Sequence, residues 1–538
     1  MTVLSSGLGA ALEIDTIVNS ESSDNWGKSR IVVVEKMQPL STYDPTKGFM
    51  YLVSELGLKF TDRHGISNTI AEEGVDGSTL NGNRIAPDGS HSKFTFRFGE
   101  IRTPFWLPRH GFLAILEKAV RGRDGVDLRE GWEVTELRRV GQGEGCLVEA
   151  TLKGPSGEEE TMRPFLVVGA DGLKSVVRNS LAEWAAEDGG ARSDRFDMEE
   201  KPSPAGGLRY KVLKLKSGFA LPHEPSTTST STGAATGGGG GSSAPKVIEA
   251  EQSYSFLSRY QGSWKDKNKE TRLGLLPIKA GYGYRTANII TWPDHDIWTN
   301  ESLASPEGMR AFLHDSFPQV PWQEALEEEE LERFARSAGG RFPLPQTTKG
   351  GATWHSKEAG VVLLGDALHA FPPDLGQGVN SALKDVATLG DALRNASSQQ
   401  QQAEGFGLGP SATALAAPAG RARLGAALDA YESEATGEAK ALVRLMQLGS
   451  PYQYSQPGLR AQVVAKLMAA NLIIRLVFSK MPMLGNTVFF PQISMLSQLS
   501  GGLSYREMLS RAHRTSFAFG PLLSTHRSAC SPAPLSFG

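Results

Sequence analysis

Residues 361–393 contain a series of local structure signals that few folds combine. A short apolar run, Val361–Leu364, leads into a Gly-Asp pair, then a loop rich in Pro and Gly, and then a long helix. The helix is indicated by apolar side chains at helical spacing, namely Val379, Ala382, Leu383, Val386, Leu389 and Leu393. A helix start carries free backbone N–H groups and partial positive charge. The segment therefore predicts a site for a phosphate or another anionic ligand edge, where Asp366 could accept hydrogen bonds from sugar hydroxyls.

Two other apolar runs, Ile31–Val34 and Phe165–Val168, have the same character as Val361–Leu364. Continuous β-branched runs of this length are typical of strands buried on both faces of a parallel sheet. Each run ends at a polar residue or a glycine, and open α/β sheets bind ligands beyond the carboxyl ends of their strands. The three ends predict one assembled nucleotide site, with three ordinary strand ends as the alternative.

The loop after Val361–Leu364 resembles the second FAD motif of class A flavoprotein monooxygenases, the aromatic hydroxylase superfamily. The matching positions are Gly365, Asp366, Ala367, His369, Pro373, Gly376, Gln377, Gly378, Asn380, Ala382 and Asp385. The resemblance implies that FAD is bound by Gly365, Asp366, Gly376, Gln377, Gly378 and Asn380. It also implies that Pro373 lies beside the flavin and the substrate cavity without an acid–base role, and that His369 is a packing residue rather than a base.

Two further segments resemble the same family. Residues 169–178 (GADGLKSVVR) are similar to its Asp-Gly motif, which implies that Asp171, Gly172 and Arg178 lie where FAD meets NAD(P)H. The pattern of Arg109, Leu113 and Leu116 resembles the start of a helix in the same family. In that family, the arginine at this position lies near the flavin diphosphate. For Arg109, an ordinary surface arginine of a helix is the alternative.

The N-terminus departs from the family pattern of a strand followed by Gly-x-Gly-x-x-Gly. Gly7 would be the third glycine, and the first two would fall on Thr2 and Leu4. We therefore expect the first strand to be missing, and we hypothesise a truncated or alternatively started product. Glu35, which closes the run IVVVE, is the expected ligand of the adenosine ribose. A plain strand-end glutamate is the alternative.

The expected fold is α/β, with a Rossmann-like FAD-binding domain, an interleaved β-sheet substrate domain and a C-terminal helical region. The expected ranges are 1–45, 85–182 and 352–445 for FAD, 46–84 and 183–351 for the substrate, and 446–538 for the helical region. The strands expected to roof the substrate are Leu208–Leu215, Gly274–Pro277 and Asn288–Trp292. Residues 226–245 and 397–420 lack apolar periodicity, which predicts two disordered insertions.

The C-terminal region resembles kynurenine 3-monooxygenase and its relatives. The residues that follow that order are Pro491, Met495, Tyr505, Glu507 and Arg511. Lys47 stands where those enzymes usually have an arginine, which argues against kynurenine itself as the substrate. A plain apolar helical cap is the alternative for this stretch.

Charge and cysteine content exclude several classes of protein. A net charge of −3 offers no basic field for nucleic acid. Two cysteines cannot build a disulfide framework or a cysteine zinc site, and no metal is expected. The sequence contains no apolar run of about 18 residues, so it predicts no transmembrane helix. The compartment, cytoplasmic or organellar, and the oligomeric state are left open.

The resemblance implies an FAD-dependent monooxygenase that uses NAD(P)H and O₂ to hydroxylate an aromatic or similar electron-rich small molecule. In that family the reaction passes through a flavin C4a-hydroperoxide. Two alternatives stay open at this stage. One is a flavin-dependent epoxidase or reductase on the same fold, and the other is a truncated, non-catalytic remnant of the FAD fold.

Overall fold

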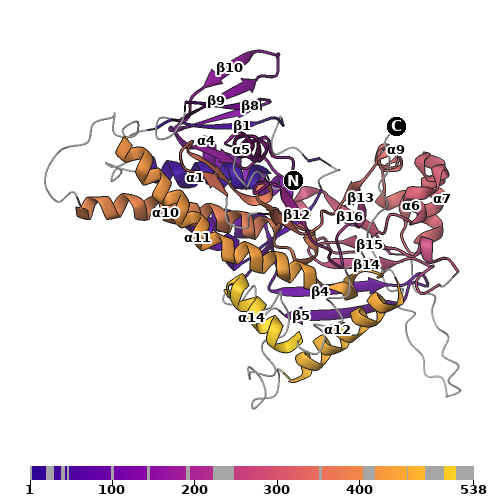
Figure 1. Ribbon diagram of the computed structural model, residues 1–538. Helices are drawn as coiled ribbons and strands as arrows, with labels where there is room; N and C mark the ends of the chain where they lie inside the picture. The colour runs from indigo at the N-terminus through magenta and orange to yellow at the C-terminus, as the bar shows by residue number, and fades with distance from the viewer. Residues whose placement is uncertain are drawn as a thin grey trace, which may run out of the picture.

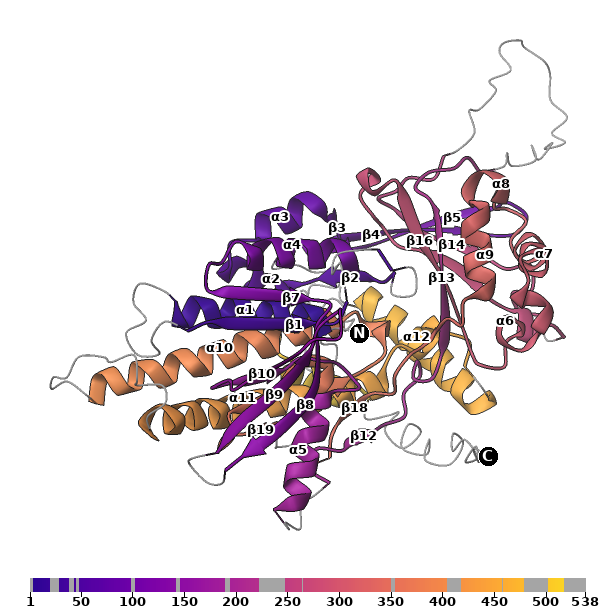
Figure 2. The same cartoon turned by 90° about the horizontal axis from the view of Figure 1, so that it is seen from above.

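The computed structural model describes residues 3–19, 29–37, 43–44, 48–97, 102–141, 146–188, 194–221, 247–263, 265–349, 354–403, 418–456, 458–478 and 502–516. These residues form two lobes, seen side by side in Figure 2. One lobe holds short parallel strand pairs and the two longest helices, α10 (Gly378–Ala403) and α11 (Pro418–Leu448). The other is a seven-stranded sheet with short helices on its outer side.

The three apolar runs that the sequence singles out all contribute parallel strands to the first lobe. β1 (Ile31–Glu35) pairs in parallel with β7 (Val126–Glu130), and β11 (Val167–Gly169) pairs in parallel with β20 (Val361–Leu363). The short β19 (His355–Ser356) adds an antiparallel edge to β20. Among the described residues, no strand joins the β1–β7 pair to the β11–β20–β19 group.

Helices cover these strands. Helix α1 (Val3–Val18) contacts β1, β11 and α10, and Figure 2 shows it between β1 and α10. The predicted apolar face of α10 is buried, with Val379, Leu383, Val386, Leu389 and Leu393 each at most 4% exposed. The other helices of this lobe are α2 (Glu55–Arg63), α3 (Ser67–Glu73), α4 (Arg109–Arg121) and α5 (Val176–Glu187).

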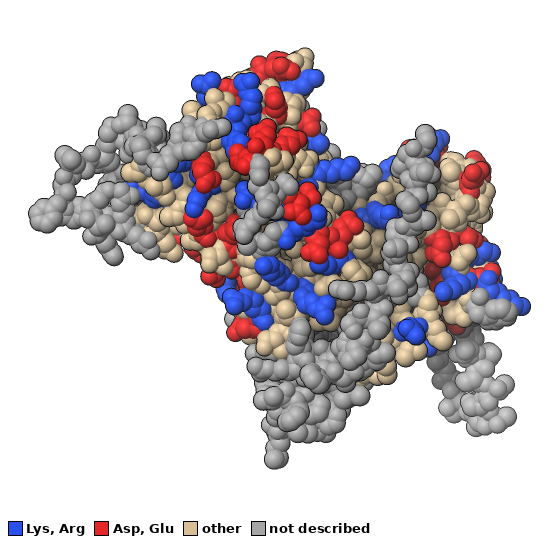
Figure 3. All heavy atoms as spheres, viewed as in Figure 1, with Lys and Arg blue, Asp and Glu red and all other residues tan. Residues whose placement is uncertain are grey.

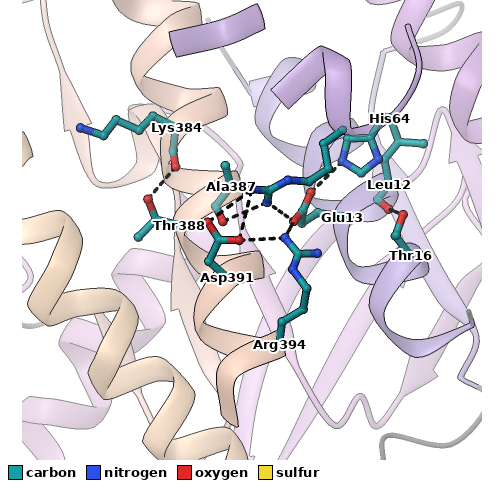
Figure 4. Close-up of polar contacts among 10 residues, drawn as sticks. Leu12, Glu13, Thr16, His64, Lys384, Ala387, Thr388, Asp391 and Arg394 are labelled. Carbon is teal, nitrogen blue, oxygen red and sulfur yellow. Dashed lines mark hydrogen bonds and ion pairs between the residues drawn. The ribbon is translucent and has the colours of Figure 1, made fainter. Parts of the chain in front are cut away.

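A buried carboxylate fastens three of these helices together. Glu13 of α1 is 1% exposed and accepts hydrogen bonds from Arg63 at 2.6 Å, from His64 Nε2 at 2.7 Å, and from Arg394 of α10. Figure 4 shows Glu13 pointing toward Arg394 with His64 beside it. A Cβ at Gly390 would stand 2.1 Å from Glu13 Oε1, so that glycine leaves the room that the carboxylate occupies.

The second lobe is built on a sheet with the strand order β17-β13-β16-β15-β14-β4-β5. Its strands are β4 (Thr79–Ile85), β5 (His91–Arg97), β13 (Arg209–Lys216), β14 (Ser253–Leu257), β15 (Arg272–Leu275), β16 (Tyr284–Thr291) and β17 (Gly340–Arg341). The three strands expected to roof the substrate correspond to the adjacent strands β13, β16 and β15. The helices on the outer side are α6 (Asp296–Thr299), α7 (Pro306–Ser316), α8 (Trp322–Ala325) and α9 (Glu328–Arg336).

The domain boundaries near the N-terminus differ from those expected. Strand β5 and the end of β4 belong to the seven-stranded sheet, although the sequence predicts that residues 85–182 belong to the FAD domain. Conversely, residues 50–76 pack with the first lobe, because Val53, Leu58 and Phe60 are buried in its core. They form β2 (Met50–Val53), α2, α3 and β3 (Val75–Asp76), and β6 (Phe105–Pro108) joins β2 and β3 in one small sheet. Short elements of this kind have too little periodicity to reveal which core they join.

The remaining strands form two small antiparallel sheets. One contains β8 (Glu133–Val140), β9 (Leu147–Lys153) and β10 (Glu159–Met162), and the other contains β12 (Met198–Glu200), β18 (Gln346–Thr348) and β21 (His369–Ala370). Figure 3 shows Lys, Arg, Asp and Glu side chains interspersed over the described part of one face, without an extended field of one sign.

The two expected insertions have different outcomes. Residues 226–245 lie outside the described residues. The range 397–420 is partly helical, because α10 continues to Ala403 and α11 begins at Pro418. Gln and Ala are good helix formers and Pro suits the first turn of a helix, so composition alone misleads here. Residues 404–417 lie outside the described residues.

Two described helices follow α11. Helix α12 spans Leu459–Phe478, and α14 (Tyr505–Ser516) packs against α11 (Figure 1). Pro491 and Met495, which carry part of the C-terminal resemblance, lie outside the described residues. Within the described part of the chain, no helix combines the length and apolar character needed to cross a membrane.

Candidate flavin site

Segments far apart in the sequence meet at the start of α1. Gly365, in the turn η6 (Gly365–Ala367) after β20, has a left-handed backbone with φ of +57°, and a Cβ there would stand 2.5 Å from Ser6 Oγ. Gly7 lies inside α1, where a Cβ would stand 3.8 Å from Cβ of Ala170. The first turn of α1 is therefore adjacent to the ends of both β11 and β20. Its unpaired N–H groups favour an anion at this point.

A buried carboxylate holds the Gly-Asp turn in shape. Asp385 Oδ2 accepts hydrogen bonds from the backbone N–H of Gly365 at 3.0 Å and from His369 Nε2 at 2.8 Å. Burial opposes protonation of His369, but the charge and hydrogen bond of Asp385 raise its pKa above the usual value. His369 and Asp385 thus hold the turn, and half-buried Asp366 lies within it.

The loop before α10 presents backbone to open space. Gly376 has φ of +63°, which explains a glycine there, and Pro373 is exposed. Within the part of the chain that the structure describes, a Cβ at Gly376 or Gly378 would meet nothing within 4 Å. By contrast, a Cβ at Gly169 would stand 2.8 Å from Leu363 Cδ2. Packing and a positive φ therefore do not account for Gly378, whereas close approach of a ligand to the backbone does.

Arg109 is a buried cation with an unpaired donor. It is the first residue of α4 and is 5% exposed, and its Nε has no hydrogen-bond partner among the described residues. Burial raises the pKa of the neighbouring Tyr51. The charge of Arg109 opposes this shift, and the charge of Asp366 adds to it. Burial and then the charge of Arg109 lower the pKa of His110 to about 4. His110 is therefore neutral at pH 7, and Arg109 carries the positive charge at the start of α4.

These features fit an FAD molecule. The buried guanidinium with its unpaired Nε suits a diphosphate, as does the start of α1. The open loop at Gly376 and Gly378, followed by the start of α10, suits the anionic edge of a flavin. Within the described residues, no group of three or more His, Cys, Asp or Glu side chains could hold a metal ion.

Other expected FAD ligands are already engaged by the protein. Asn380 is fully buried, and its amide nitrogen donates to the carbonyls of Leu52 at 2.8 Å and Gly376 at 3.1 Å. Its Oδ1 accepts from the Ser54 N–H at 2.9 Å. Asn380 therefore fastens the loop after β2 to α10. Glu35 is 8% exposed and its Oε1 accepts from the Met37 N–H at 2.9 Å, beyond the end of β1.

The Asp-Gly motif likewise serves the fold. Asp171 accepts from the Ser175 hydroxyl and, at 3.2 Å, from the Val177 N–H, which caps α5. Gly172 has φ of +81°. The Arg178 guanidinium donates to the carbonyl of Ala367 at 2.8 Å, so it ties α5 to the Gly-Asp turn. Burial lowers the pKa of Arg178, and the charge of Asp171 opposes that shift.

Two residues near the loop before α10 have surroundings that the FAD motif does not predict. Asp374 is 9% exposed, and neither carboxyl oxygen accepts a hydrogen bond of ordinary geometry from a described residue. Burial raises its pKa to about 7, although the amides of Ser450 and Asp374 itself offset part of the effect. The second is Tyr505, whose hydroxyl donates to Gln377 Oε1 at 3.0 Å. A carboxylate inside a Pro/Gly loop is the sequence signal for Asp374. Tyr505 stands out only through the C-terminal resemblance, which does not reveal its contact with Gln377.

Comparison with known proteins agrees with this geometry. The FAD binding domain family matches residues 29–206 and 321–405. The FAD-dependent monooxygenase ausM of Emericella nidulans is 26% identical over 308 residues, which cover 55% of this chain and 51% of that protein. Violacein synthase of Chromobacterium violaceum is 26% identical over 252 residues, or 47% of this chain and 46% of that protein. The chain thus spans about half the length of these curated relatives.

A solved structure shares the fold. A ternary complex of aklavinone-11 hydroxylase with FAD and aklavinone aligns with a TM-score of 0.50 and 17% identity, covering 82% of this chain and 65% of that chain. The mixed α/β fold class predicted from the sequence, with its helical C-terminal region, is confirmed. The chain is thus similar to FAD binding domains and to FAD-dependent monooxygenases.

Proposed function

We propose that this chain binds FAD and uses NAD(P)H and O₂ to hydroxylate an aromatic or similarly electron-rich small molecule. The observation that carries the proposal is the pairing of an open glycine loop with a buried cation. Among the described residues, no atom fills the space that Gly376 and Gly378 face, and none is a hydrogen-bond partner of the buried Arg109 Nε. The family match over residues 29–206 and 321–405 includes all three of these residues.

Each group has a distinct part in holding the cofactor. Bound FAD, once reduced, supplies the chemistry that transfers one oxygen atom of O₂ to the substrate. Arg109 and the start of α1 hold the diphosphate, and Gly365 allows Asp366 to approach the ribityl chain or the ribose. The N-terminus of α10 stabilises negative charge on the flavin edge. Exposed Pro373 borders the substrate space and moves no proton.

An aromatic cluster on the substrate side supports an aromatic substrate. Phe49 and Tyr210 pack at 5.0 Å between ring centroids, and Tyr210 and Phe342 at 5.4 Å. Tyr454 packs against the same cluster and follows Gln453, whose amide donates to the Asp374 carbonyl at 3.4 Å. The cluster thus adjoins the loop that carries Pro373. Such rings make the protein apolar beside that loop, which would help to exclude water from the reacting atoms.

A closer relationship to kynurenine 3-monooxygenase-like enzymes is part of the proposal. Its support is the order of Tyr505, Glu507 and Arg511 in α14. The relatives with monooxygenase activity do not favour a non-catalytic remnant, and they do not favour an epoxidase or reductase.

The test is oxygen transfer by the purified chain loaded with FAD. NADH and NADPH oxidation would be followed in air across a panel of phenolic acids, aminobenzoyl compounds and kynurenine. We expect at least one aromatic compound to stimulate oxidation, and its product to gain one labelled atom under ¹⁸O₂. Oxidation that no aromatic compound stimulates, or a product labelled from water, would overturn the proposal.

A further inference from the structure

The C-terminal helix α14 reaches the loop that precedes α10. Tyr505 is its first residue, and the Tyr505 hydroxyl donates a hydrogen bond to Gln377 Oε1 at 3.0 Å. Both side chains are 2% exposed. The Gln377 amide nitrogen in turn donates to the Leu375 carbonyl at 3.1 Å. A continuous chain of hydrogen bonds therefore runs from α14 into the loop between Pro373 and Gly378.

The start of α14 is itself fixed in two ways. Ser504 and Glu507 form a capping box, in which the Ser504 N–H donates to Glu507 Oε2 at 2.9 Å and the Glu507 N–H donates to Ser504 Oγ at 3.2 Å. Glu438 of α11 accepts from the Tyr505 N–H at 2.9 Å and pairs with Lys384 of α10. Tyr505 is thus held against α10 and α11 independently of its hydroxyl.

The space around Tyr505 is small and lined largely by polar side chains. A cavity of about 20 Å³, the size of one water molecule, is lined by residues that include His369, Lys384, Asp385, Glu438 and Tyr505. Burial raises the pKa of the Tyr505 phenol well above its ordinary value, so the hydroxyl stays protonated and acts as the donor. Loss of that donor would leave the Gln377 carbonyl buried and unpaired, which is unfavourable.

We propose that Tyr505 is a positioning residue for the flavin, because its hydrogen bond to Gln377 fixes the backbone of Gly376–Gly378 in the form that receives the cofactor. The inference rests on the proposed function, which places the flavin edge at that loop. Docking of α14 and binding of FAD are then coupled, and each strengthens the other by the same factor. The family match ends at residue 405, so it assigns no role to α14.

The direct test is Tyr505→Phe, which removes one oxygen atom and keeps the ring. We expect FAD to bind about tenfold more weakly, the order expected for one buried hydrogen bond. We also expect a shift in the flavin visible absorption band and in its midpoint potential, because the loop N–H groups facing the flavin move. A merely structural role would lower stability without moving the spectrum of bound flavin.

Tyr260→Phe is the matched control. The Tyr260 hydroxyl also donates to a protein group, Asp315, but it lies in the other lobe. Its FAD affinity and flavin spectrum should equal those of the wild type. A double-mutant cycle with Gln377→Leu tests the route, because Tyr505→Phe should change FAD affinity little once Gln377 is absent.

Hydrogen exchange of the wild-type chain adds a test that needs no variant. Added FAD should slow exchange at the amides of residues 376–380 and also at those of α14. If Tyr505→Phe does not fold, protection confined to 376–380 would overturn the coupling. Equal FAD affinity and equal spectra for wild type and a folded Tyr505→Phe would overturn it as well. A folded wild type that does not bind FAD would contradict the proposed function itself, and the coupling would fall with it.

Discussion

Arg178 donates a hydrogen bond from its guanidinium to the backbone carbonyl of Ala367 at 2.8 Å, across 189 positions of sequence. A second hydrogen bond, to the Leu173 carbonyl at 2.7 Å, holds the same side chain. The arginine of one family-like motif therefore supports the turn of the other. It joins α5 to the Gly-Asp turn after β20, beside the candidate flavin site.

Replacement of Arg178 should lower stability directly. Arg178→Ala removes one buried and one part-buried hydrogen bond to backbone carbonyls, and we expect a loss of about 2–4 kcal/mol in the free energy of unfolding. Arg178→Lys keeps the charge but cannot make both bonds in the same geometry, so it should recover only part of that loss. Urea unfolding measures both variants. A loss below about 0.5 kcal/mol for Arg178→Ala would show that the two bonds contribute little.

Gly378→Ala should separate FAD affinity from stability. A Cβ there meets no protein atom within 4 Å, so thermal unfolding without FAD should be nearly unchanged. If the backbone lies against the flavin, the added methyl group should weaken FAD binding about tenfold or more, a cost of at least ~1.4 kcal/mol. Gly281→Ala is the matched control, because a Cβ at Gly281 is equally unobstructed and Gly281 lies in the turn between β15 and β16 of the other lobe. Equal FAD affinities for Gly378→Ala and Gly281→Ala would argue against this contact.

Glu13→Gln tests the buried carboxylate that joins α1, α2 and α10. Burial opposes ionisation of Glu13, but bonds and charges from His64, Arg394 and Arg63 outweigh it and lower its pKa below 4.5. Its contribution is therefore complete above pH 4.5 and is lost as the pH falls through the lowered value. We expect Glu13→Gln to cost about 2 kcal/mol at pH 7. The difference from wild type should shrink below about pH 4.

The exposed Glu329→Gln is the control for that measurement, because Glu329 lies on the solvent side of α9. Its stability should follow the wild type at every pH. A Glu13→Gln variant whose deficit stays constant down to pH 3 would contradict the assignment of the deficit to the ionised carboxylate.

Asp374 should affect the pH dependence of stability in the direction opposite to Glu13, because its ionised form destabilises the folded protein. The pKa of Asp374 rises from 3.8 to about 7 on burial, so ionisation favours the unfolded chain as the pH rises between these values. The wild type should therefore lose up to ~4 kcal/mol relative to Asp374→Asn between pH 4 and pH 8. Chemical unfolding across that range measures the difference. Parallel profiles would show that Asp374 is not held neutral in the folded protein.

The sequence predicts the elements of this fold better than the roles of its side chains. Helix α10 and strand β20 follow from local spacing of apolar residues, because a long amphipathic helix and a β-branched run carry their own signal. Asn380 is different, since the motif implies an FAD ligand and the structure shows its amide bound to Leu52, 328 positions away. The contact between Tyr505 and Gln377 spans 128 positions. Partners of this kind depend on tertiary packing, which spacing within a motif does not encode.

The central claim is that Gly376, Gly378 and Arg109 form the site of an FAD molecule. Titration of the purified, folded chain with FAD, followed by the visible spectrum and by equilibrium dialysis, tests it most directly. We predict saturable binding of one FAD per chain with a perturbed flavin spectrum, weakened by Gly378→Ala and by Arg109→Ala. A folded wild type that leaves FAD in solution, or that binds it equally well in both variants, would contradict the account.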